Sequence, residues 1–92
     1  MIVPETTLRR KGDVLYAPVG SDRTVMLSVS AGSYFGLNSV GTRIWELLAT
    51  PMTVADICAR LCEEFEVEAE HCRTAVLQFA EEVVDKGLVY AA

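Results

Sequence analysis

The chain has 92 residues, 51% of them hydrophobic, and eight Lys and Arg against 13 Asp and Glu give a formal charge of −5. This length suits one small domain with a single core and excludes two stable domains. The acidic balance repels a phosphate backbone, which disfavours nucleic acid as a partner. No apolar run approaches the ~20 residues that span a bilayer, and residues 1–5 lack the pattern of a secretory signal. We therefore expect a soluble, cytoplasmic protein without a membrane partner.

The first stretch, residues 1–12, mixes polar and apolar types without a period and contains the basic cluster Arg9-Arg10-Lys11. Such a run is typical of a solvated, loosely ordered terminus. We predict an N-terminal arm over residues 1–12, followed by a single domain over residues 13–90.

Three strand-like segments follow, over residues 13–18, 24–29 and 33–37, each bounded by turn-forming residues. A three-residue loop, Ser30-Ala31-Gly32, would close a hairpin in which Val29 lies opposite Ser33. In that register, the core face of the sheet carries Leu15, Ala17, Val25, Leu27, Phe35 and Leu37. The opposite face carries Tyr16, Met26, Ser28, Tyr34 and Gly36.

Helical periodicity begins after Asn38-Ser39, which supplies a side-chain oxygen for an N-cap. The pattern predicts helices over residues 39–49, 53–65 and 69–86, and Gly87 is the expected stop of the last one. Val89-Tyr90 adds a brief extended tail. Because the sheet and the helices must bury their apolar faces against each other, we predict an α+β fold. Its outline is winged helix-turn-helix-like, with a three-stranded antiparallel sheet followed by three helices.

The third strand, Ser33–Leu37, has the composition of an unprotected sheet edge. It contains neither lysine nor proline, the residues that commonly blunt an edge against pairing with another chain. This composition predicts that the strand pairs with an added segment, either a peptide or a second copy of the chain in a homodimer.

Catalytic and metal-binding patterns are weak. The single histidine, His71, lies among acidic residues at a helix start, and no glycine-rich phosphate loop is present. Cys58 and Cys62 lie one helical turn apart and, with Cys72, suggest a metal site, but their apolar stripe favours core packing. An odd number of cysteines without an export signal argues against a disulfide framework. We therefore expect neither an enzyme nor a cofactor nor a metal site.

The third helix carries two apolar rows. Its core stripe is Cys72, Val76, Phe79 and Val83, and a second row is Arg73, Leu77, Ala80 and Val84. Periodicity alone leaves two alternatives for the second row: packing on the first helix or the sheet, or a binding surface.

An ordered set of residues resembles the PqqD family, which comprises the coenzyme PQQ biosynthesis protein D and its relatives. The matching residues are Tyr34-Phe35-Gly36-Leu37-Asn38, Gly41, Ile44-Trp45, Leu47-Leu48, Thr53-Val54, Ile57, Leu61, Phe79 and Gly87-Leu88. Members of this family are the peptide-recognition elements of ribosomal-peptide natural product pathways (RiPP recognition elements). The strand motif most resembles the stand-alone leader-peptide-binding proteins of lasso-peptide biosynthesis.

This resemblance implies a non-catalytic domain that binds the leader segment of a precursor peptide as a strand added to the third strand, in a cleft against the third helix. It also implies delivery of that peptide to a separate processing enzyme such as a leader peptidase. Carried over to this sequence, the peptide-binding residues are Ser33, Tyr34, Phe35, Gly36 and Leu37, with Arg73, Val76, Leu77, Ala80 and Val84 as the helix wall. Lasso-type members often have an acidic residue where this chain has Ser28.

Two functions from other classes stay open at this stage. A winged-helix DNA-binding transcriptional regulator would use the second and third helices, although residues 69–86 offer only Arg73 and Lys86 as cations. A small metal-linked regulator would use Cys58, Cys62 and Cys72.

Overall fold

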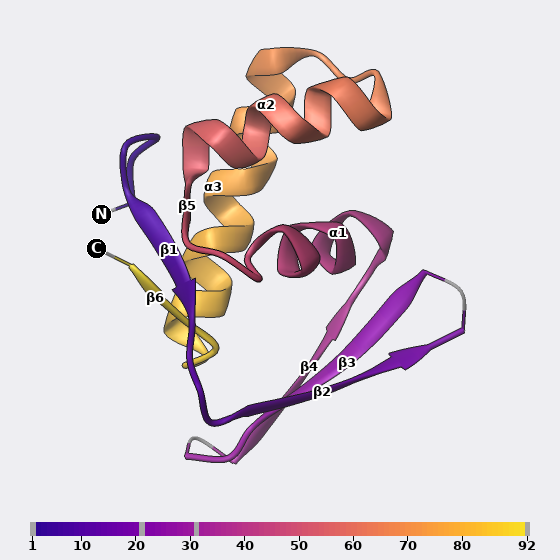
Figure 1. The fold of residues 1–92 in the computed structure, drawn as a ribbon, viewed down its shortest axis with the longest axis vertical. Helices are drawn as coiled ribbons and strands as arrows, with labels where there is room; N and C mark the ends of the chain where they lie inside the picture. The colour runs from indigo at the N-terminus through magenta and orange to yellow at the C-terminus, as the bar shows by residue number, and fades with distance from the viewer. Residues whose placement is uncertain (1, 21, 31, 92) are drawn as a thin grey trace.

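The computed structural model describes residues 2–20, 22–30 and 32–91 of the chain. Its elements, in chain order, are β1 (Thr7–Arg10), β2 (Val14–Val19), β3 (Arg23–Ser28), β4 (Ser33–Leu37), α1 (Ser39–Leu47), β5 (Met52–Thr53), α2 (Val54–Phe65), α3 (Ala69–Asp85) and β6 (Val89–Ala91) (Figure 1). They form two three-stranded antiparallel sheets, ordered β5-β1-β6 and β2-β3-β4. The predicted α+β class is confirmed, and the second sheet adds to it. Among the described residues, no helix has the length and apolarity needed to cross a membrane.

The N-terminal segment differs from the irregular arm predicted over residues 1–12. Thr7–Arg10 forms β1, the central strand of the small sheet, and pairs Leu8 with both Met52 and Ala91. Leu8 is fully buried in the core. Because β1 has only four residues and its partners lie more than 40 positions away in sequence, no local hydrophobic period indicates this strand. The extended tail expected at Val89-Tyr90 is confirmed as the start of β6.

Arg10 joins the small sheet to α1. Its Nε and Nη2 both donate to the Trp45 carbonyl oxygen, with Nε at 3.1 Å. Trp45 lies in the last turn of α1, where carbonyl groups lack helical partners and a positive charge is favourable, and α1 has no cation of its own there. Arg10 therefore supplies from β1 the C-terminal charge that α1 lacks.

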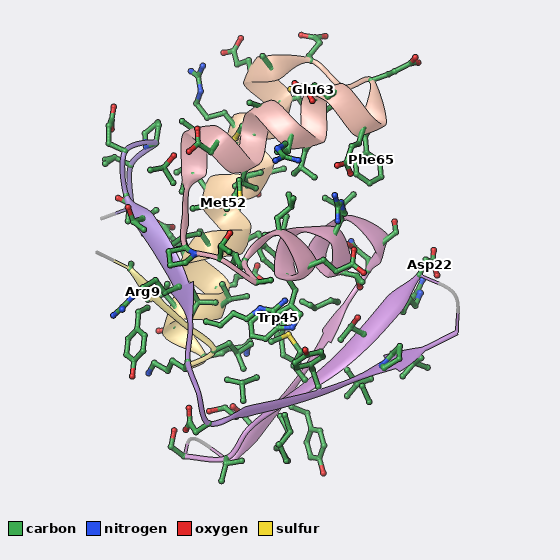
Figure 2. All side chains as sticks on the ribbon, in the orientation of Figure 1. Arg9, Asp22, Trp45, Met52, Glu63 and Phe65 are labelled. Atoms are coloured by element: carbon green, nitrogen blue, oxygen red, sulfur yellow. The ribbon has the colours of Figure 1, made fainter. Side chains whose placement is uncertain are left out.

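Two aromatic rings surround the same guanidinium. The Arg10 Cζ lies 4.3 Å from the Trp45 ring centroid and 5.3 Å from that of Tyr16. The two rings meet edge to face, with centroids 5.5 Å apart. Figure 2 shows Trp45 between α1 and the β2-β3-β4 sheet. Arg10 thus holds together one residue from α1 and one from β2.

The register of the β3–β4 hairpin differs by one residue from the prediction. Ser28 pairs with Ser33, and Met26 pairs with Phe35, so the connection is one residue longer than a three-residue loop. Gly32 has φ +66° and donates its N–H to the Ser28 carbonyl at 2.8 Å, which favours the longer turn.

This register reverses the predicted faces of β2 and β3, because the side-chain period of a strand is two. Met26 is fully buried, whereas Leu15 is 61% exposed and Val25 40% exposed. Phe35 and Leu37 still face the core and Tyr34 still faces outward, as predicted. The error is therefore confined to the two strands whose position depended on the loop length.

We predict that Arg10→Ala lowers the free energy of unfolding by about 2–3 kcal/mol, because it removes hydrogen bonds from a charged donor and two cation–π contacts. Arg9→Ala is the matched control: the Arg9 side chain is exposed, and its one interaction among the described residues is with the Tyr90 ring, 5.4 Å away. This control should cost about 0.5 kcal/mol. Urea unfolding measures both values, and equal losses in the two variants would contradict the role of Arg10.

Candidate functional site

Strand β4 has a free edge in the described sheet. Its neighbour β3 is the central strand, and β2 lies beyond β3. In an antiparallel sheet, the residues of a central strand form backbone hydrogen bonds alternately with one neighbour and with the other. This alternation shows which N–H and C=O groups of β4 point away from β3. Val29 donates its N–H to the Asp13 carbonyl at 3.2 Å, so the odd-numbered residues of β3 bond to β2. The even-numbered residues of β3 therefore bond to Ser33, Phe35 and Leu37.

The N–H and C=O groups of Tyr34 and Gly36 consequently point to the open edge. Both residues are exposed, and nothing lies within 4 Å of a Cβ built on Gly36. The edge thus offers two donors and two acceptors to an extended segment, with room for a close backbone approach at Gly36.

The opposite edge of the same sheet is protected. Pro18 in β2 pairs with Thr24, an even-numbered residue whose backbone groups face β4. The missing N–H of Pro18 therefore lies on the outer side of β2, where it interrupts the row of donors. Of the two edges, β4 is the one suited to strand addition.

One side of α3 faces β4. The Lys86 ammonium, just after the helix, lies 5.5 Å from the Phe35 ring centroid. The Phe79 ring lies 3.0 Å from a Cβ built on Gly41, where Leu37 also approaches to 3.4 Å. Residues 79, 82 and 86 share this side at helical spacing. Phe79 and Lys86 therefore lie on the side of α3 nearest β4, and helical spacing adds Glu82 to that side; we call these three residues the α3 wall.

The five residues expected as the helix wall lie in and beside the core stripe of α3. Val76 and Ala80 are buried in the core, and Leu77 and Val84 are partly buried against it. Arg73 lines a surface pocket with Cys58 and Cys62 of α2. At 100° per residue, the row that includes Arg73, Leu77 and Val84 lies on the opposite side of the core stripe from Phe79 and Lys86. The structure thus brings Ser33–Leu37 together in β4 and places Arg73, Leu77 and Val84 on the other side of the core stripe from Phe79.

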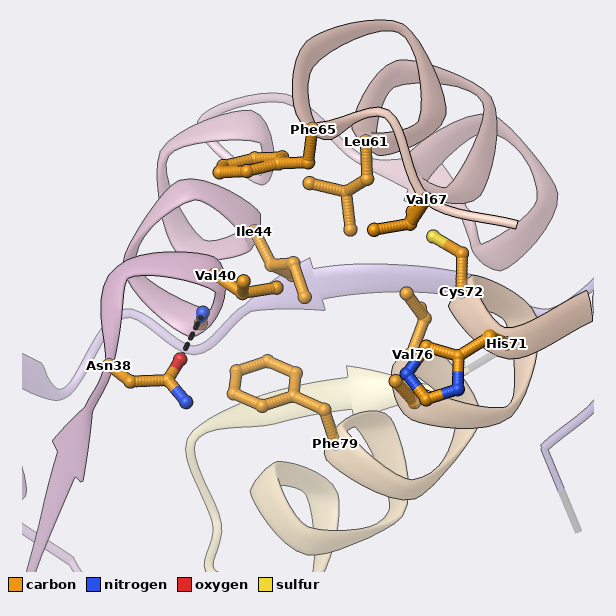
Figure 3. Close-up of a pocket in the computed structure, with 12 residues that line it drawn as sticks. Asn38, Val40, Ile44, Leu61, Phe65, Val67, His71, Cys72, Val76 and Phe79 are labelled. Atoms are coloured by element: carbon orange, nitrogen blue, oxygen red, sulfur yellow. Dashed lines mark hydrogen bonds between the residues drawn. The ribbon is translucent and has the colours of Figure 1, made fainter. Parts of the chain in front are cut away.

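An apolar pocket of about 290 Å³ lies where β4 runs into α1 (Figure 3). Its lining comes from the N-cap of α1, α1 itself, α2, the α2–α3 connection and α3, namely Asn38, Val40, Gly41, Ile44, Leu61, Phe65, Val67, His71, Cys72, Ala75, Val76 and Phe79. Figure 3 shows Phe65 and Leu61 across the space from Phe79 and Val76. The side-chain oxygen of Asn38 accepts the Gly41 N–H at 2.9 Å, which fixes the start of α1 at the pocket rim. An apolar side chain from a segment on β4 fits this site chemically.

Sequence reasoning did not identify this pocket. Val40, Ile44 and Leu61 had the helical spacing of core residues, and Phe79 belonged to the predicted core stripe. The available sequence signal was Phe65, a large apolar residue at the very end of a predicted helix. In the structure, its side chain remains 39% exposed.

Arg43 of α1 braces Glu64 of α2 beside this pocket. Its Nε and Nη2 donate to the two carboxylate oxygens at 2.8 and 2.9 Å. Glu46 adds a second contact to Arg43 at 3.3 Å. The hydrogen bond from Arg43 is the main cause that holds the pKa of Glu64 below its ordinary value. The Arg43–Glu64 ion pair therefore fixes the end of α2 against α1, next to the position at which Phe65 lines the pocket.

Chemistry at the remaining candidate residues is limited. Within residues 2–20, 22–30 and 32–91, no group of three or more His, Cys, Asp or Glu is arranged to hold a metal ion. His71 is exposed at the pocket rim. Ser28 is buried and donates to the Gly87 carbonyl at 3.4 Å, so it joins β3 to the end of α3.

Residues 23–89, well over half of the chain, match the family model for coenzyme PQQ synthesis protein D (PqqD). The chain belongs to the PqqD family. A search of curated proteins finds no match. Among solved structures, the chain is similar to TbiB1 in complex with the TbiA(beta) leader peptide, with 30% sequence identity and a TM-score of 0.80. The alignment covers 88% of this chain and 93% of the TbiB1 chain.

The family match includes the whole candidate site. It starts at the first residue of β3 and extends to the first residue of β6, so β4, α3 and the pocket are all within it. Strands β1 and β2 precede the matched region. The PqqD-type resemblance expected from Tyr34-Phe35-Gly36-Leu37-Asn38 and the helical positions is confirmed.

We predict that Glu64→Gln lowers the urea midpoint of unfolding slightly at pH 7, with Glu63→Gln as the neighbouring control without an ion pair in the described structure. Because the folded pKa of Glu64 lies below its ordinary value of 4.5, the stabilisation is fully present above that pH. It is lost as the pH falls through the lowered pKa. The difference between wild type and Glu64→Gln should therefore shrink below about pH 4.5, and a difference that grows on acidification would contradict this assignment.

Proposed function

We propose that this PqqD-family protein binds the leader segment of a ribosomally made precursor peptide, as a strand antiparallel to β4, and has no catalytic activity of its own. The observation that carries the proposal is the open edge of β4 next to an apolar pocket. The similarity to TbiB1, a protein solved with a leader peptide, supports the same function. The product class that best fits this similarity is a lasso peptide.

The backbone of β4 supplies the sequence-tolerant part of binding. Tyr34 and Gly36 present their N–H and C=O groups to the added strand, while Phe35 and Leu37 anchor β4 in the core. Main-chain pairing gives affinity with little selectivity, and alternate side chains of the added strand then point to opposite faces of the sheet. The inward side chains meet Phe79, Glu82 and Lys86.

The pocket and the α3 wall supply selectivity. We expect an apolar or aromatic leader residue to enter the pocket beyond Leu37, because its lining is mostly aliphatic and aromatic. We propose Phe79, Glu82 and Lys86 as the wall in place of Arg73, Leu77 and Val84. Val76 contributes from the pocket floor, and Ala80 supports it from the core.

Delivery completes the proposed role. The bound leader holds the rest of the precursor close to the domain, and a separate processing enzyme such as a leader peptidase acts on it there. This division suits the weak catalytic chemistry of the described residues, in which the single histidine is exposed at the pocket rim.

We predict that Gly36→Pro preserves the fold but weakens leader binding at least tenfold. Proline removes a backbone donor that points to the open edge, so the ladder to β3 keeps its hydrogen bonds. A synthetic leader peptide from a neighbouring precursor gene, labelled for fluorescence anisotropy, measures the affinity, and circular dichroism checks the fold.

The matched control is Ala17→Gly on β2, which lies across β3 from Gly36 and is exposed on the same outer face. It should leave the affinity unchanged. Sedimentation of the unliganded protein tests whether the same edge pairs two copies, in which case Gly36→Pro also abolishes the dimer. A folded Gly36→Pro variant that binds the leader like wild type would refute strand addition at β4.

We predict that Gly41→Ala weakens leader binding about tenfold while changing the free energy of unfolding by less than about 1 kcal/mol. The new methyl group would lie 3.0 Å from the edge of the Phe79 ring, so the ring must move, and the free space available to it is the pocket. Gain of helix propensity offsets the cost of this shift in the fold. Anisotropy and urea unfolding give the two values.

Gly12→Ala is the control for this substitution, because nothing lies within 4 Å of a Cβ built there. It should change neither binding nor the pocket. If Gly41→Ala binds the leader as tightly as wild type, the pocket is not the anchor site, even if strand addition at β4 holds.

A further inference from the structure

The outer face of the β2-β3-β4 sheet is apolar and exposed. Figure 1 shows the three helices on the other side of this sheet. The pairing register places odd-numbered residues of β2 and β3 and even-numbered residues of β4 on the outer face. Its large exposed side chains are Leu15, Val19, Val25, Val29 and Tyr34, and it is completed by Ala17, Leu27 and Gly36. Leader binding as proposed above uses the edge of β4 and leaves this face free.

The size of this face suits an interface. At their exposed fractions, its five large side chains present on the order of 600 Å² to solvent, which is the upper limit for apolar patches on most monomers. Two such faces in contact bury about 1,200 Å² in total, where specific protein–protein interfaces begin. A second copy of the chain is therefore large enough an occupant.

The face consists of cross-strand rows that differ in side-chain size. One row contains large side chains, namely Leu15, Leu27 and Tyr34. The next row along the strands contains smaller ones, namely Ala17, Val25 and Gly36. Nothing lies within 4 Å of a Cβ built on Gly36, so this row leaves open space. A surface that stacks the large row on a small row would fill that space.

Charge lies only at the two ends of this face among its described residues. Asp13 lies beside Val29 at one end, where its carbonyl accepts the Val29 N–H. Arg23 pairs with Val19 at the other end and is exposed. One end of the face is thus acidic and the other basic.

From these features, we infer that the outer face binds a second copy of the chain, sheet on sheet, about a two-fold axis that runs across the strands. Two sheets packed face to face lie ~10 Å apart with their strands nearly aligned. An axis across the strands exchanges the two ends of the face, so the large row of each copy lies on the small row of its partner. Leu15 then packs on the partner's Ala17, and Tyr34 packs on the partner's Gly36. Asp13 lies near the partner's Arg23.

The other aligned packing has its two-fold axis parallel to the strands and fits poorly. It keeps the ends of the face in place, so Arg23 of β3 meets the partner's Arg23. The small row then lies on the partner's small row, which leaves a void. Size and charge therefore both favour the axis across the strands. This packing leaves both β4 edges free, so each copy can still add a leader strand.

Sedimentation equilibrium of the full-length protein without peptide tests the dimer. Wild type should reach twice the monomer mass of 10.1 kDa as its concentration rises. Val25→Lys should raise the dimer dissociation constant at least tenfold, because it buries an ammonium group against the partner's Leu27. Gln78→Lys adds the same charge at an exposed position of α3 and should leave dimerisation unchanged. Circular dichroism checks the fold of each variant.

A size exchange tests the direction of the axis. Ala17→Leu should weaken the dimer about tenfold, because two large side chains then meet at both symmetric contacts. The double variant Leu15→Ala with Ala17→Leu should restore it, since a large side chain again lies on a small one. An axis parallel to the strands predicts the opposite result for Ala17→Leu, which would then fill the void and tighten the dimer.

Two results would overturn the inference. Wild type that stays monomeric up to about 1 mM has no such interface, and loss of a processing enzyme's binding in Val25→Lys would then assign the face to that enzyme. A dimer that dissociates when leader peptide is added pairs through the β4 edge instead of the face. Anisotropy on monomeric Val25→Lys measures leader binding separately, so a leader that fails to bind refutes the proposed function and not the dimer.

Discussion

The alternation of backbone hydrogen bonds across β3 is the constraint on which the sheet and its free edge depend. Ser28 pairs with Ser33, and the Val29 N–H bonds to the Asp13 carbonyl. Consecutive residues of β3 therefore form backbone hydrogen bonds alternately with β4 and with β2. The same alternation directs Met26, Phe35 and Leu37 to the core and leaves the polar backbone groups of Tyr34 and Gly36 without a strand partner in the described sheet. A shift of one residue would change the faces and the free groups together.

The helices hold this edge in place through contacts that come from distant parts of the chain. Arg10 of β1 binds the last turn of α1, and Arg43 of α1 binds the end of α2. Lys86 then reaches from the end of α3 to Phe35. The helices around β4 are therefore held by side chains that join successive elements, and the pocket forms where α1, α2 and α3 converge at the end of the strand.

Much of the fold was predictable from sequence, and the failures have physical causes. The three helices and the strands β2, β3 and β4 carry clear periods and turn residues, and the bare composition of Ser33–Leu37 indicated a free edge. A loop one residue longer than expected reversed the faces of β2 and β3. Strand β1 is too short to show a period, and on α3 periodicity defines a core stripe but not the side that approaches β4. Only the tertiary contacts of Phe79 and Lys86 distinguish the two sides.

The energetics of the proposed strand addition explain why the edge alone would bind a peptide weakly. Two N–H and two C=O groups, at about 1 kcal/mol for each net hydrogen bond, give about 4 kcal/mol, which corresponds to a millimolar dissociation constant before the cost of ordering the peptide. A single apolar side chain fully buried in the pocket adds about 2 kcal/mol or more, and it does so only for a peptide with the right residue at the right register. In the proposed complex, affinity and choice of partner would therefore come from the same contact, while the backbone of Tyr34 and Gly36 would fix the direction and position of the added strand.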